Sequence, residues 1–360
     1  MAACRLHAPL TALRHVGLID DFVVTDATLR GAPRSGLFDV VWLQRGADAA
    51  LARLLAARLP GRFLLDVDDH LLCRPAYLAP DDLPDAEALT DALTACRVLT
   101  MPSWRLAGLL EQRVGVSLAG KARTCPNAVA FGGGGLRRPQ RPVAVLLTQS
   151  HRLALTVSEG DVLGAIAEFA ARRRLPLWCL GAQSPALRVA AASAGAALAT
   201  LTPRSYRQYH ADLAAGPVLL GVAPLETRGD AQTNEFVSGK SDIKMVEYGG
   251  YGHPAVYSRA APYVDTDISC GRRADNDHAA WTAALEELYE DGWQALVDEQ
   301  RAVRERRDLE RVAAESWWPA LEAARLEEPV DAAKLLSDLD RLRALARDGV
   351  TRARWHLRPR

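Results

Sequence analysis

The chain lacks an excess of charge of either sign, a long apolar run and a paired-cysteine motif. Among its 360 residues, Lys and Arg number 44 and Asp and Glu also number 44, so the formal net charge is zero. We therefore expect no nucleic-acid-binding surface, because such surfaces concentrate positive charge. No apolar run approaches the roughly 18 residues that a membrane-spanning helix needs. We expect no transmembrane segment, while peripheral contact with a membrane stays open.

The six cysteines are scattered along the chain, and none belongs to a CxxC pair. This pattern predicts buried thiols in a reducing compartment, with neither a disulfide framework nor a zinc site. The N-terminal segment 1–17 is interrupted by arginine, histidine and proline, so it lacks the apolar core of a secretory signal. We therefore expect a cytoplasmic protein.

The composition is that of an ordinary globular protein, with 49% hydrophobic and 24% charged residues, and the length suits two domains. Short apolar strands alternate with helical stretches, which is the pattern of parallel sheets covered by helices. Four consecutive glycines followed by arginines and prolines mark a linker over 131–142. We predict Rossmann-like domains over 1–130 and 143–277 and a helical segment over 278–360.

Charged residues follow two predicted strands of the first domain. Arg45 follows the predicted strand 38–43, and Asp68 and Asp69 follow the predicted strand 62–67. Ligands of open parallel sheets bind beyond the carboxyl ends of the strands, so these residues are candidate site residues. The arginine can clamp a phosphate or carboxylate, or it can be a surface residue. The aspartates can bind an acceptor, hold a divalent metal ion or cap a turn.

The same rule selects three residues of the second domain. Ser150 and His151 come shortly after the predicted strand 143–147, and Gly181 ends the predicted strand 177–181. The histidine can serve as a general acid or base, can bond a bound sugar, or can have no functional role.

The stretch 234–258 has the clearest local pattern in the chain. Ser241 is expected to be the N-cap of a short helix over 243–248, and a buried strand is expected over 255–258. Glycines tolerate positive φ, and three of them are expected to end the helix: Gly249, Gly250 and Gly252.

Lys240, Lys244 and Glu247 are spaced to lie on one face of this helix. Two lysines at a helix N-terminus suit a phosphate or diphosphate, and a carboxylate further along can accept hydrogen bonds from sugar hydroxyls. The set therefore fits a nucleoside diphosphate with its ribose. The alternative is a solvated helix face with one intrahelical ion pair.

The stretch APLETRGDAQTNEFVSGKSDIKMVEYGGYGHPAVYS resembles the nucleotide-sugar site of GT-B glycosyltransferases of the large retaining group. Ten positions match that pattern in order: Pro224, Leu225, Lys240, Ser241, Lys244, Glu247, Tyr248, Gly252, Pro254 and Ser258. The segments DVVWLQR, LLDVDDHL, VLTMPS and CPNAV and the opening CRLHAPLTALRHVG also resemble signatures of these bacterial enzymes. The resemblance covers roughly residues 4–282.

The resemblance implies a GT-B fold, in which two Rossmann-like domains face each other across a cleft and a late helix crosses back to the first domain. It implies transfer of a sugar, with retention, from a nucleotide-sugar donor to a glycan, lipid-linked or protein acceptor, as in polysaccharide biosynthesis. No metal ion or other cofactor is expected.

The resemblance also implies a division of roles among the candidate residues. The lysines and the helix start would bind the diphosphate, the glutamate would bind the ribose, and the first domain would supply catalytic and acceptor contacts. The nucleotide-sugar set comprises Lys240, Ser241, Lys244, Glu247, Gly181, Ser150 and His151, and the catalytic set comprises Arg45, Asp68 and Asp69.

One departure keeps other functions open. Many retaining GT-B enzymes carry a glutamate eight positions before the ribose-binding one, where this chain has Gly239; the nearest carboxylate is Glu235. This feature favours a non-catalytic nucleotide-sugar-binding or scaffolding module. A GT-B-shaped epimerase or phosphorylase is a further alternative, although a phosphorylase would need a pyridoxal lysine site that we do not find.

Overall fold

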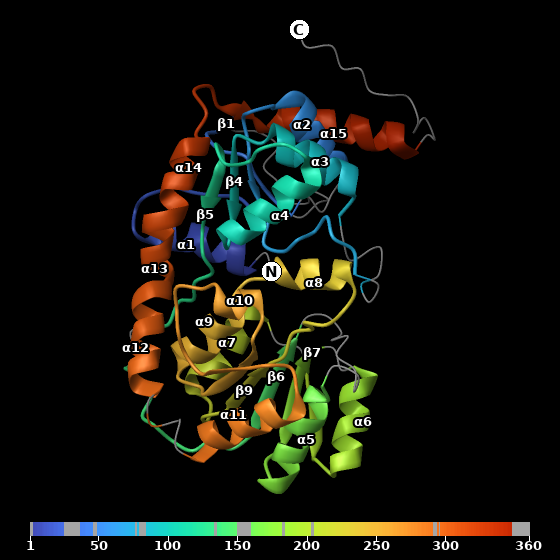
Figure 1. Ribbon diagram of the computed structural model, residues 1–360. Helices are drawn as coiled ribbons and strands as arrows, with labels where there is room; N and C mark the ends of the chain where they lie inside the picture. Colours follow the sequence, from blue (N-terminus) through green and yellow to red (C-terminus); the bar gives the residue numbers. More distant parts are fainter. Residues whose placement is uncertain are drawn as a thin grey trace. The chain divides into compact units, whose positions relative to one another are not determined.

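The computed structural model comprises two compact units (Figure 1). Unit 1 comprises Met1–Leu72, Pro80–Pro126 and Ala313–Arg360, and unit 2 comprises Cys73–Ala79 and Asn127–Val312. The structure describes residues 3–24, 37–45, 49–75, 78, 84–132, 135–149, 160–181, 184–202, 205–290, 294 and 296–347.

Unit 1 is built on a parallel sheet of four strands in the order β2-β3-β4-β5. The strands are β2 (Trp42–Gln44), β3 (Leu64–Asp66), β4 (Val98–Met101) and β5 (Ala122–Thr124). The predicted strand 38–43 is wrong in extent, because Leu37–Phe38 is a separate strand, β1, which pairs antiparallel with β12 (Val330–Asp331). Gln44, Asp66 and Thr100 share one row across the sheet, so polar groups meet where the strands end.

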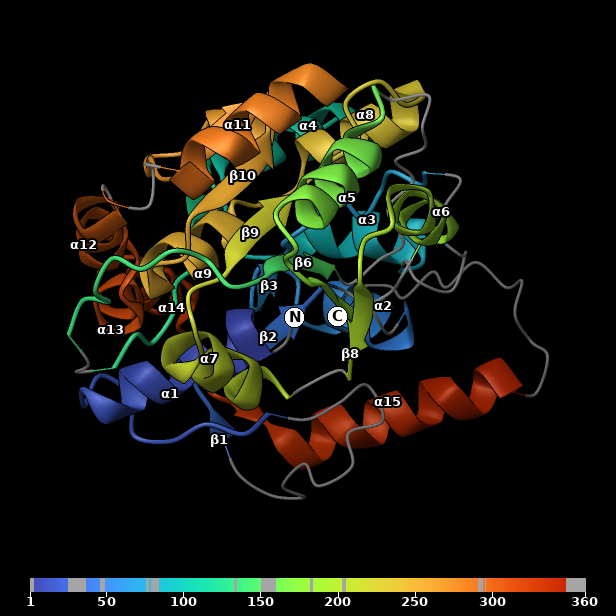
Figure 2. The same cartoon turned by 90° about the horizontal axis from the view of Figure 1, so that it is seen from below.

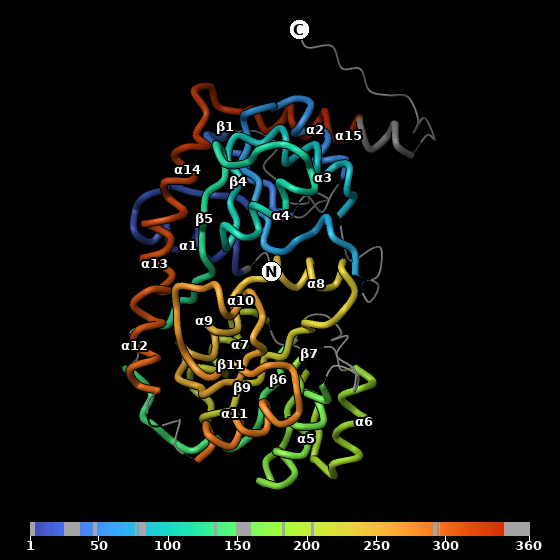
Figure 3. The backbone as a smooth tube through the Cα atoms, in the orientation of Figure 1, coloured from blue at the N-terminus to red at the C-terminus, as the bar shows by residue number. Residues whose placement is uncertain are grey.

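The helices of unit 1 lie on both faces of this sheet. They are η1 (Ala3–His7), α1 (Ala8–His15), α2 (Ala49–Arg58), α3 (Ala86–Ala95), α4 (Trp104–Val114), η4 (Ala313–Trp317), α14 (Trp318–Ala324) and α15 (Ala332–Arg347). The main core joins α2, α3 and α4 to inward side chains of the strands, such as Leu65 and Leu99. On the other face α14 packs against β4, and Trp42 stacks on Trp317. Figure 3 traces the chain from α14 into α15.

Unit 2 contains a parallel sheet of six strands in the order β11-β10-β9-β6-β7-β8. The strands are β6 (Val145–Gln149), β7 (Leu177–Gly181), β8 (Leu198–Leu201), β9 (Leu220–Ala223), β10 (Ala255–Ser258) and β11 (Arg272–Ala274). The central strands are buried on both faces, which explains their continuous apolar sequence.

Two separate cores cover the two faces of this sheet. Figure 2 shows the helices that lie on either side of it. One face carries α5 (Val162–Arg172), α6 (Pro185–Ala194) and α11 (His278–Glu290). The other carries α7 (Tyr206–Ala215), α8 (Ala231–Ser238), α9 (Ile243–Tyr251), α10 (Ala261–Val264) and α12 (Leu296–Arg307), and α13 (Leu309–Val312) follows α12. The unit is therefore a doubly wound α/β domain.

The described part of the segment predicted as an unpacked linker, 131–142, packs within unit 2. Phe131 is buried in the second core, and Arg137 donates hydrogen bonds to the backbone carbonyls of Tyr251, Gly216 and Leu213 at 2.6 to 3.0 Å. Its glycine and proline content conceals this, because the contacts come from side chains on either side of the glycines.

Helix α9 is longer than predicted. It continues through Gly249 and Gly250 to Tyr251, and only Gly252 has a positive φ, 71°, at its end. The two helical glycines serve packing: a Cβ at Gly249 would lie 2.6 Å from the Cys270 sulfur, and one at Gly250 would collide with an aromatic ring.

The six cysteines are buried and free, as predicted. Within the ranges that the structure describes, no helix combines the length and the apolar character needed to cross a membrane.

Candidate functional site

The start of α9 lies at the edge of the unit 2 sheet where the parallel strands end. The chain leaves β9, passes through α8, and returns along α9 to the first residue of β10. Because β9 and β10 are parallel neighbours, this return places the α9 N-terminus at their carboxyl side. The topology therefore puts the predicted nucleotide stretch where such sheets bind ligands.

The local geometry at the start of α9 differs from the prediction. The N-cap position is Asp242, not Ser241. The Asp242 carboxylate makes no cap; it accepts hydrogen bonds from Thr266 Oγ1 at 2.6 Å and Arg307 Nη2 at 2.8 Å. Lys240 lies in the connection between α8 and α9, so the prediction that it shares the helix face of Lys244 and Glu247 is wrong, whereas Lys244 and Glu247 do share a face. The sequence could not show that the Asp242 carboxylate bonds Arg307, which is 65 positions away, and not the helix N-terminus.

The two lysines have separate partners. The Lys240 ammonium lies 4.6 Å from the centroid of the Phe236 ring of α8. The Lys244 Nζ lies 2.7 Å from Glu247 Oε2 and 5.4 Å from the centroid of the Tyr209 ring. The ion pair that the sequence offered as an alternative is therefore present.

Glu247 is nevertheless no member of a solvated helix face, because its residue is only 5% exposed. Its Oε2 accepts hydrogen bonds from Lys244 Nζ at 2.7 Å and from Tyr209 OH at 3.0 Å. Its Oε1 accepts no hydrogen bond from any residue in the described part of the chain; its neighbour is His210 Nε2 at 3.8 Å. One carboxylate oxygen is thus fixed, and the other can accept a bond from a ligand hydroxyl.

His210 is a neutral neighbour of this carboxylate. Burial lowers the pKa of its imidazole, although the charge of Glu247 opposes the shift. Its Nδ1 lies 3.1 Å from Tyr251 OH, which anchors the ring to α9. The sequence did not indicate Tyr209 and His210, because they lie more than 30 positions before Glu247 and only the packing of α7 on α9 brings them beside it.

Tyr248 fixes α9 on the sheet. Its hydroxyl lies 2.9 Å from Thr148 Oγ1 near the end of β6. A Cβ at Gly221 of β9 would lie 2.6 Å from the Tyr248 ring, so glycine is needed at that strand position. This anchoring holds the neighbouring Glu247 in place.

The remaining predicted residues of the second domain have different outcomes. Gly181 ends β7 with a φ of 108°, a conformation that favours glycine. Ser150 and His151 lie outside the described residues.

In unit 1 the structure brings Arg45, Asp68 and Asp69 together. The Arg45 Nε lies 2.8 Å from Asp68 Oδ1, and its Nη2 donates to Asp69 Oδ2 at 3.0 Å. Arg45 has a φ of 63°, which is uncommon for a residue with a side chain and often marks a functional position. The three candidates therefore form one charged cluster at the carboxyl ends of β2 and β3.

Asp68 is the most unusual carboxyl of this cluster. It is 3% exposed, and its Oδ2 has no hydrogen-bond partner among the described residues. Burial and then the charge of Asp69 raise the pKa of Asp68 to about 6, although Arg45 opposes them. A carboxyl of this kind can accept a hydrogen bond or a proton from a ligand hydroxyl.

A buried hydrogen-bond network surrounds Asp66, the last residue of β3, two positions before Asp68. Arg5, which is 1% exposed, contacts both oxygens of Asp66 at 2.5 and 3.2 Å and donates to the Cys125 carbonyl at 2.6 Å. Thr100 Oγ1 donates to Asp66 Oδ1 at 2.8 Å. The supporting role of Arg5 was not predicted, although Arg5 lies in the opening segment that carried the family resemblance.

No group of three or more His, Cys, Asp and Glu side chains among the described residues is arranged to hold a metal ion. The carboxylates at this end of the unit 1 sheet are paired with guanidinium groups: Asp66 with Arg5, and Asp68 and Asp69 with Arg45.

Comparison with known proteins identifies the fold. No family model matches the sequence, and no curated protein does. Anabaena HepE in complex with UDP and glucose superposes with a TM-score of 0.54 and 13% identity, over 77% of this chain and 76% of HepE. HepE in complex with UDP-glucose gives a TM-score of 0.52.

This chain has the GT-B fold. A variant of S. aureus TarM in complex with UDP also superposes, with a TM-score of 0.50, 9% identity, and coverage of 72% of this chain and 50% of TarM. The GT-B fold expected from the sequence is therefore confirmed.

Proposed function

We propose that this GT-B protein is a glycosyltransferase that moves a sugar from a nucleotide-diphosphate sugar to an acceptor. The observation that carries the proposal is Glu247, a buried carboxylate with one oxygen held by Lys244 and Tyr209 and the other available. It lies on the helix that begins at the carboxyl-terminal edge of the unit 2 sheet, where open parallel sheets commonly bind ligands. HepE, which shares the fold, has been solved with UDP-glucose, so we propose a uridine nucleotide as the first donor to test.

The donor is proposed to bind unit 2 through its diphosphate and ribose. Lys240, Lys244 and the backbone at Ser241 would neutralise the diphosphate, and Glu247 would accept hydrogen bonds from the ribose. Negative charge grows on the departing diphosphate during transfer, so fixed positive groups there lower the barrier. Gly181, Ser150 and His151 are proposed as further donor contacts.

The acceptor is proposed to contact the unit 1 cluster. Asp68 has an oxygen that no described residue bonds, which suits an acceptor hydroxyl, while Arg45, itself paired with Asp69, holds Asp68 in position. We propose that transfer retains the anomeric configuration and needs no metal ion. A glycan, a lipid-linked sugar and a glycosylated protein all present suitable hydroxyls.

Thermal unfolding with a panel of nucleoside diphosphates and nucleotide sugars tests the donor site. A ligand at about 100 times its dissociation constant stabilises the folded protein by about 2.7 kcal/mol, which raises the melting temperature measurably. The shift should vanish in the double variant Lys240→Met, Lys244→Met and persist in Lys334→Met, which removes an exposed lysine of α15. A shift that survives the double variant would place the diphosphate elsewhere.

A second candidate is a nucleotide-sugar-binding module without catalysis. The observation that favours it is Gly239, at the position where many retaining GT-B enzymes carry a carboxylate. Release of nucleoside diphosphate from a bound donor separates the two candidates: binding without release supports the module, and release that depends on added acceptor supports the enzyme.

A further inference from the structure

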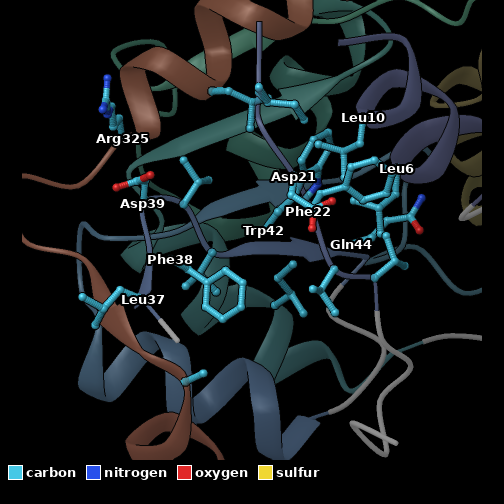
Figure 4. Close-up of a pocket in the computed structure, with 18 of the residues that line it drawn as sticks. Leu6, Leu10, Asp21, Phe22, Leu37, Phe38, Asp39, Trp42, Gln44 and Arg325 are labelled. Carbon is cyan, nitrogen blue, oxygen red and sulfur yellow. The ribbon is translucent and has the colours of Figure 1, made fainter. Parts of the chain in front are cut away.

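Unit 1 contains a cavity of about 760 Å³ beside its edge strand β2. Every residue from Leu37 to Gln44 lines it, so the cavity follows the course of this strand. In Figure 4, Asp39 and Arg325 lie at one end of the cavity, and Leu6, Leu10 and Gln44 lie toward the other.

The backbone of β2 is hydrogen-bonded on one side only. Toward β3, the Val41 carbonyl accepts from Leu64 N at 2.9 Å, and Arg45 N donates to the Asp66 carbonyl at 2.7 Å. Backbone groups alternate in direction along a strand, so Trp42 and Gln44 direct theirs away from β3 and toward the cavity. β2 is the edge of the sheet, and in the described ranges no strand pairs with this outer side.

Apolar side chains from helices on both faces of the sheet line the cavity. Leu10 of α1 and Leu321 of α14 line it from the layer of Trp317, on which Trp42 stacks. Leu55 of α2 and Leu335 of α15 line it from the main core of unit 1. A space between two helix layers and beside an unpaired strand edge is where one more strand could pair with the sheet.

Polar groups along the cavity add chemical detail. Trp42 Nε1 and Gln44 Nε2 are buried and lack a hydrogen-bond partner among the described residues. The charged lining is mainly acidic, with one arginine, and comprises Asp20, Asp21, Asp39, Glu322 and Arg325. Asp21 is already paired with Arg14 at 3.2 Å, but carboxylates still outnumber the one arginine of the lining. An occupant with hydrogen-bonding groups and net positive charge therefore complements the cavity.

We propose that the outer edge of β2 binds an extended, apolar β-strand of another polypeptide, flanked by basic residues. Such a strand extends the sheet by main-chain hydrogen bonds and buries apolar side chains against both helix layers. An alkyl or isoprenoid chain of equal volume would leave the backbone of Trp42 and Gln44 unpaired, so the observations favour a peptide. This inference does not depend on the proposed function of the α9 site.

The probe for this site is a synthetic peptide of alternating valine and leucine between two lysines. Its matched control carries N-methyl groups on alternate backbone nitrogens, which removes hydrogen bonds while the apolar side chains remain. We expect the control to bind at least about tenfold more weakly by calorimetric titration, since several hydrogen bonds are lost. Amide hydrogen exchange at Trp42 and Gln44 should slow when the unmodified peptide binds.

Variants of the cavity wall give an independent test. Leu336→Arg places a positive charge in the lining of α15, and Ser337→Arg places the same charge at the adjacent exposed position. Binding of the lysine-flanked peptide should fall at least about tenfold in Leu336→Arg and stay within about twofold in Ser337→Arg. Hydrogen exchange of the central strand β4 checks that both variants are folded.

Four results would overturn the proposal. The first is equal binding of the N-methylated peptide or of an alkyl glucoside, which would indicate an apolar-chain site. The second is protection of the Trp42 and Gln44 amides in the free protein at low concentration, which would show that this chain pairs the edge itself. The third is protection that appears with rising protein concentration, which would indicate a second copy. The fourth is no binding of the probe at any concentration that its solubility permits.

Discussion

Asp68 shows, at the scale of single residues, how burial changes the chemistry of a predicted site. Its pKa is raised from 3.8 to about 6 by burial and by Asp69. A carboxyl with a raised pKa favours folding at low pH, and this contribution is lost as the pH rises from about 4 through about 6. At neutral pH, above this pKa, Asp68 is charged, and its burial beside Asp69 then lowers the stability of the folded protein.

Asp68→Asn should remove this pH dependence. The amide resembles the protonated acid, and Asp69 remains as a partner for Arg45. The unfolding free energy of the variant minus that of the unmodified protein should increase by about 2 kcal/mol as the pH rises from about 4 to about 7. Urea unfolding followed by circular dichroism measures the difference, and parallel curves for the two proteins would contradict the assignment.

Tyr209 is predicted to position the ribose-binding carboxylate. Tyr209→Phe removes the hydroxyl that donates to Glu247 Oε2 and keeps the ring beside Lys244. Nucleoside diphosphate affinity should fall by about three- to tenfold, the effect of one hydrogen bond to a charged group. Tyr289→Phe, on the other face of the sheet against Phe169, should bind normally. Equal nucleotide affinity of the unmodified protein, Tyr209→Phe and Tyr289→Phe would show that Tyr209 does not position the carboxylate.

At the scale of elements, the close packing of α9 depends on glycines inside the helix. A Cβ at Gly250 would collide with the Phe131 ring, so Gly250→Ala should lower the unfolding free energy by about 2 kcal/mol. Gly108→Ala in α4 meets open space and should be neutral or slightly stabilising. Thermal melting compares the two variants, and a neutral Gly250→Ala would show that Phe131 moves aside freely.

Elements with strong local patterns were predicted well. The strands 177–181 and 255–258 were predicted with the bounds that the structure has. Helix α8 was not predicted. The predicted strand 38–43 was wrong, because this segment contributes to two strands, β1 and β2, that belong to different sheets. Its division depends on pairing with β12, almost three hundred residues away, which periodicity does not report.

At the scale of the whole molecule, the sequence predicted the GT-B fold through a motif and through alternating strands and helices. It placed Arg45, Asp68 and Asp69 at neighbouring strand ends, and parallel pairing brings them together. It could not predict Arg5 beneath them, because the partner Asp66 is 61 residues away and no periodicity links the two.

The most direct test of the central claim measures binding of UDP and of its 2′,3′-dideoxy analogue by isothermal titration. If Glu247 accepts hydrogen bonds from the ribose, the unmodified protein should bind the analogue at least about tenfold more weakly. Glu247→Gln should bind UDP more weakly and should distinguish the two nucleotides far less, while Glu235→Gln should behave as the unmodified protein. Undiminished UDP binding by Glu247→Gln, with full discrimination between the nucleotides, would contradict the assignment of the donor site to α9.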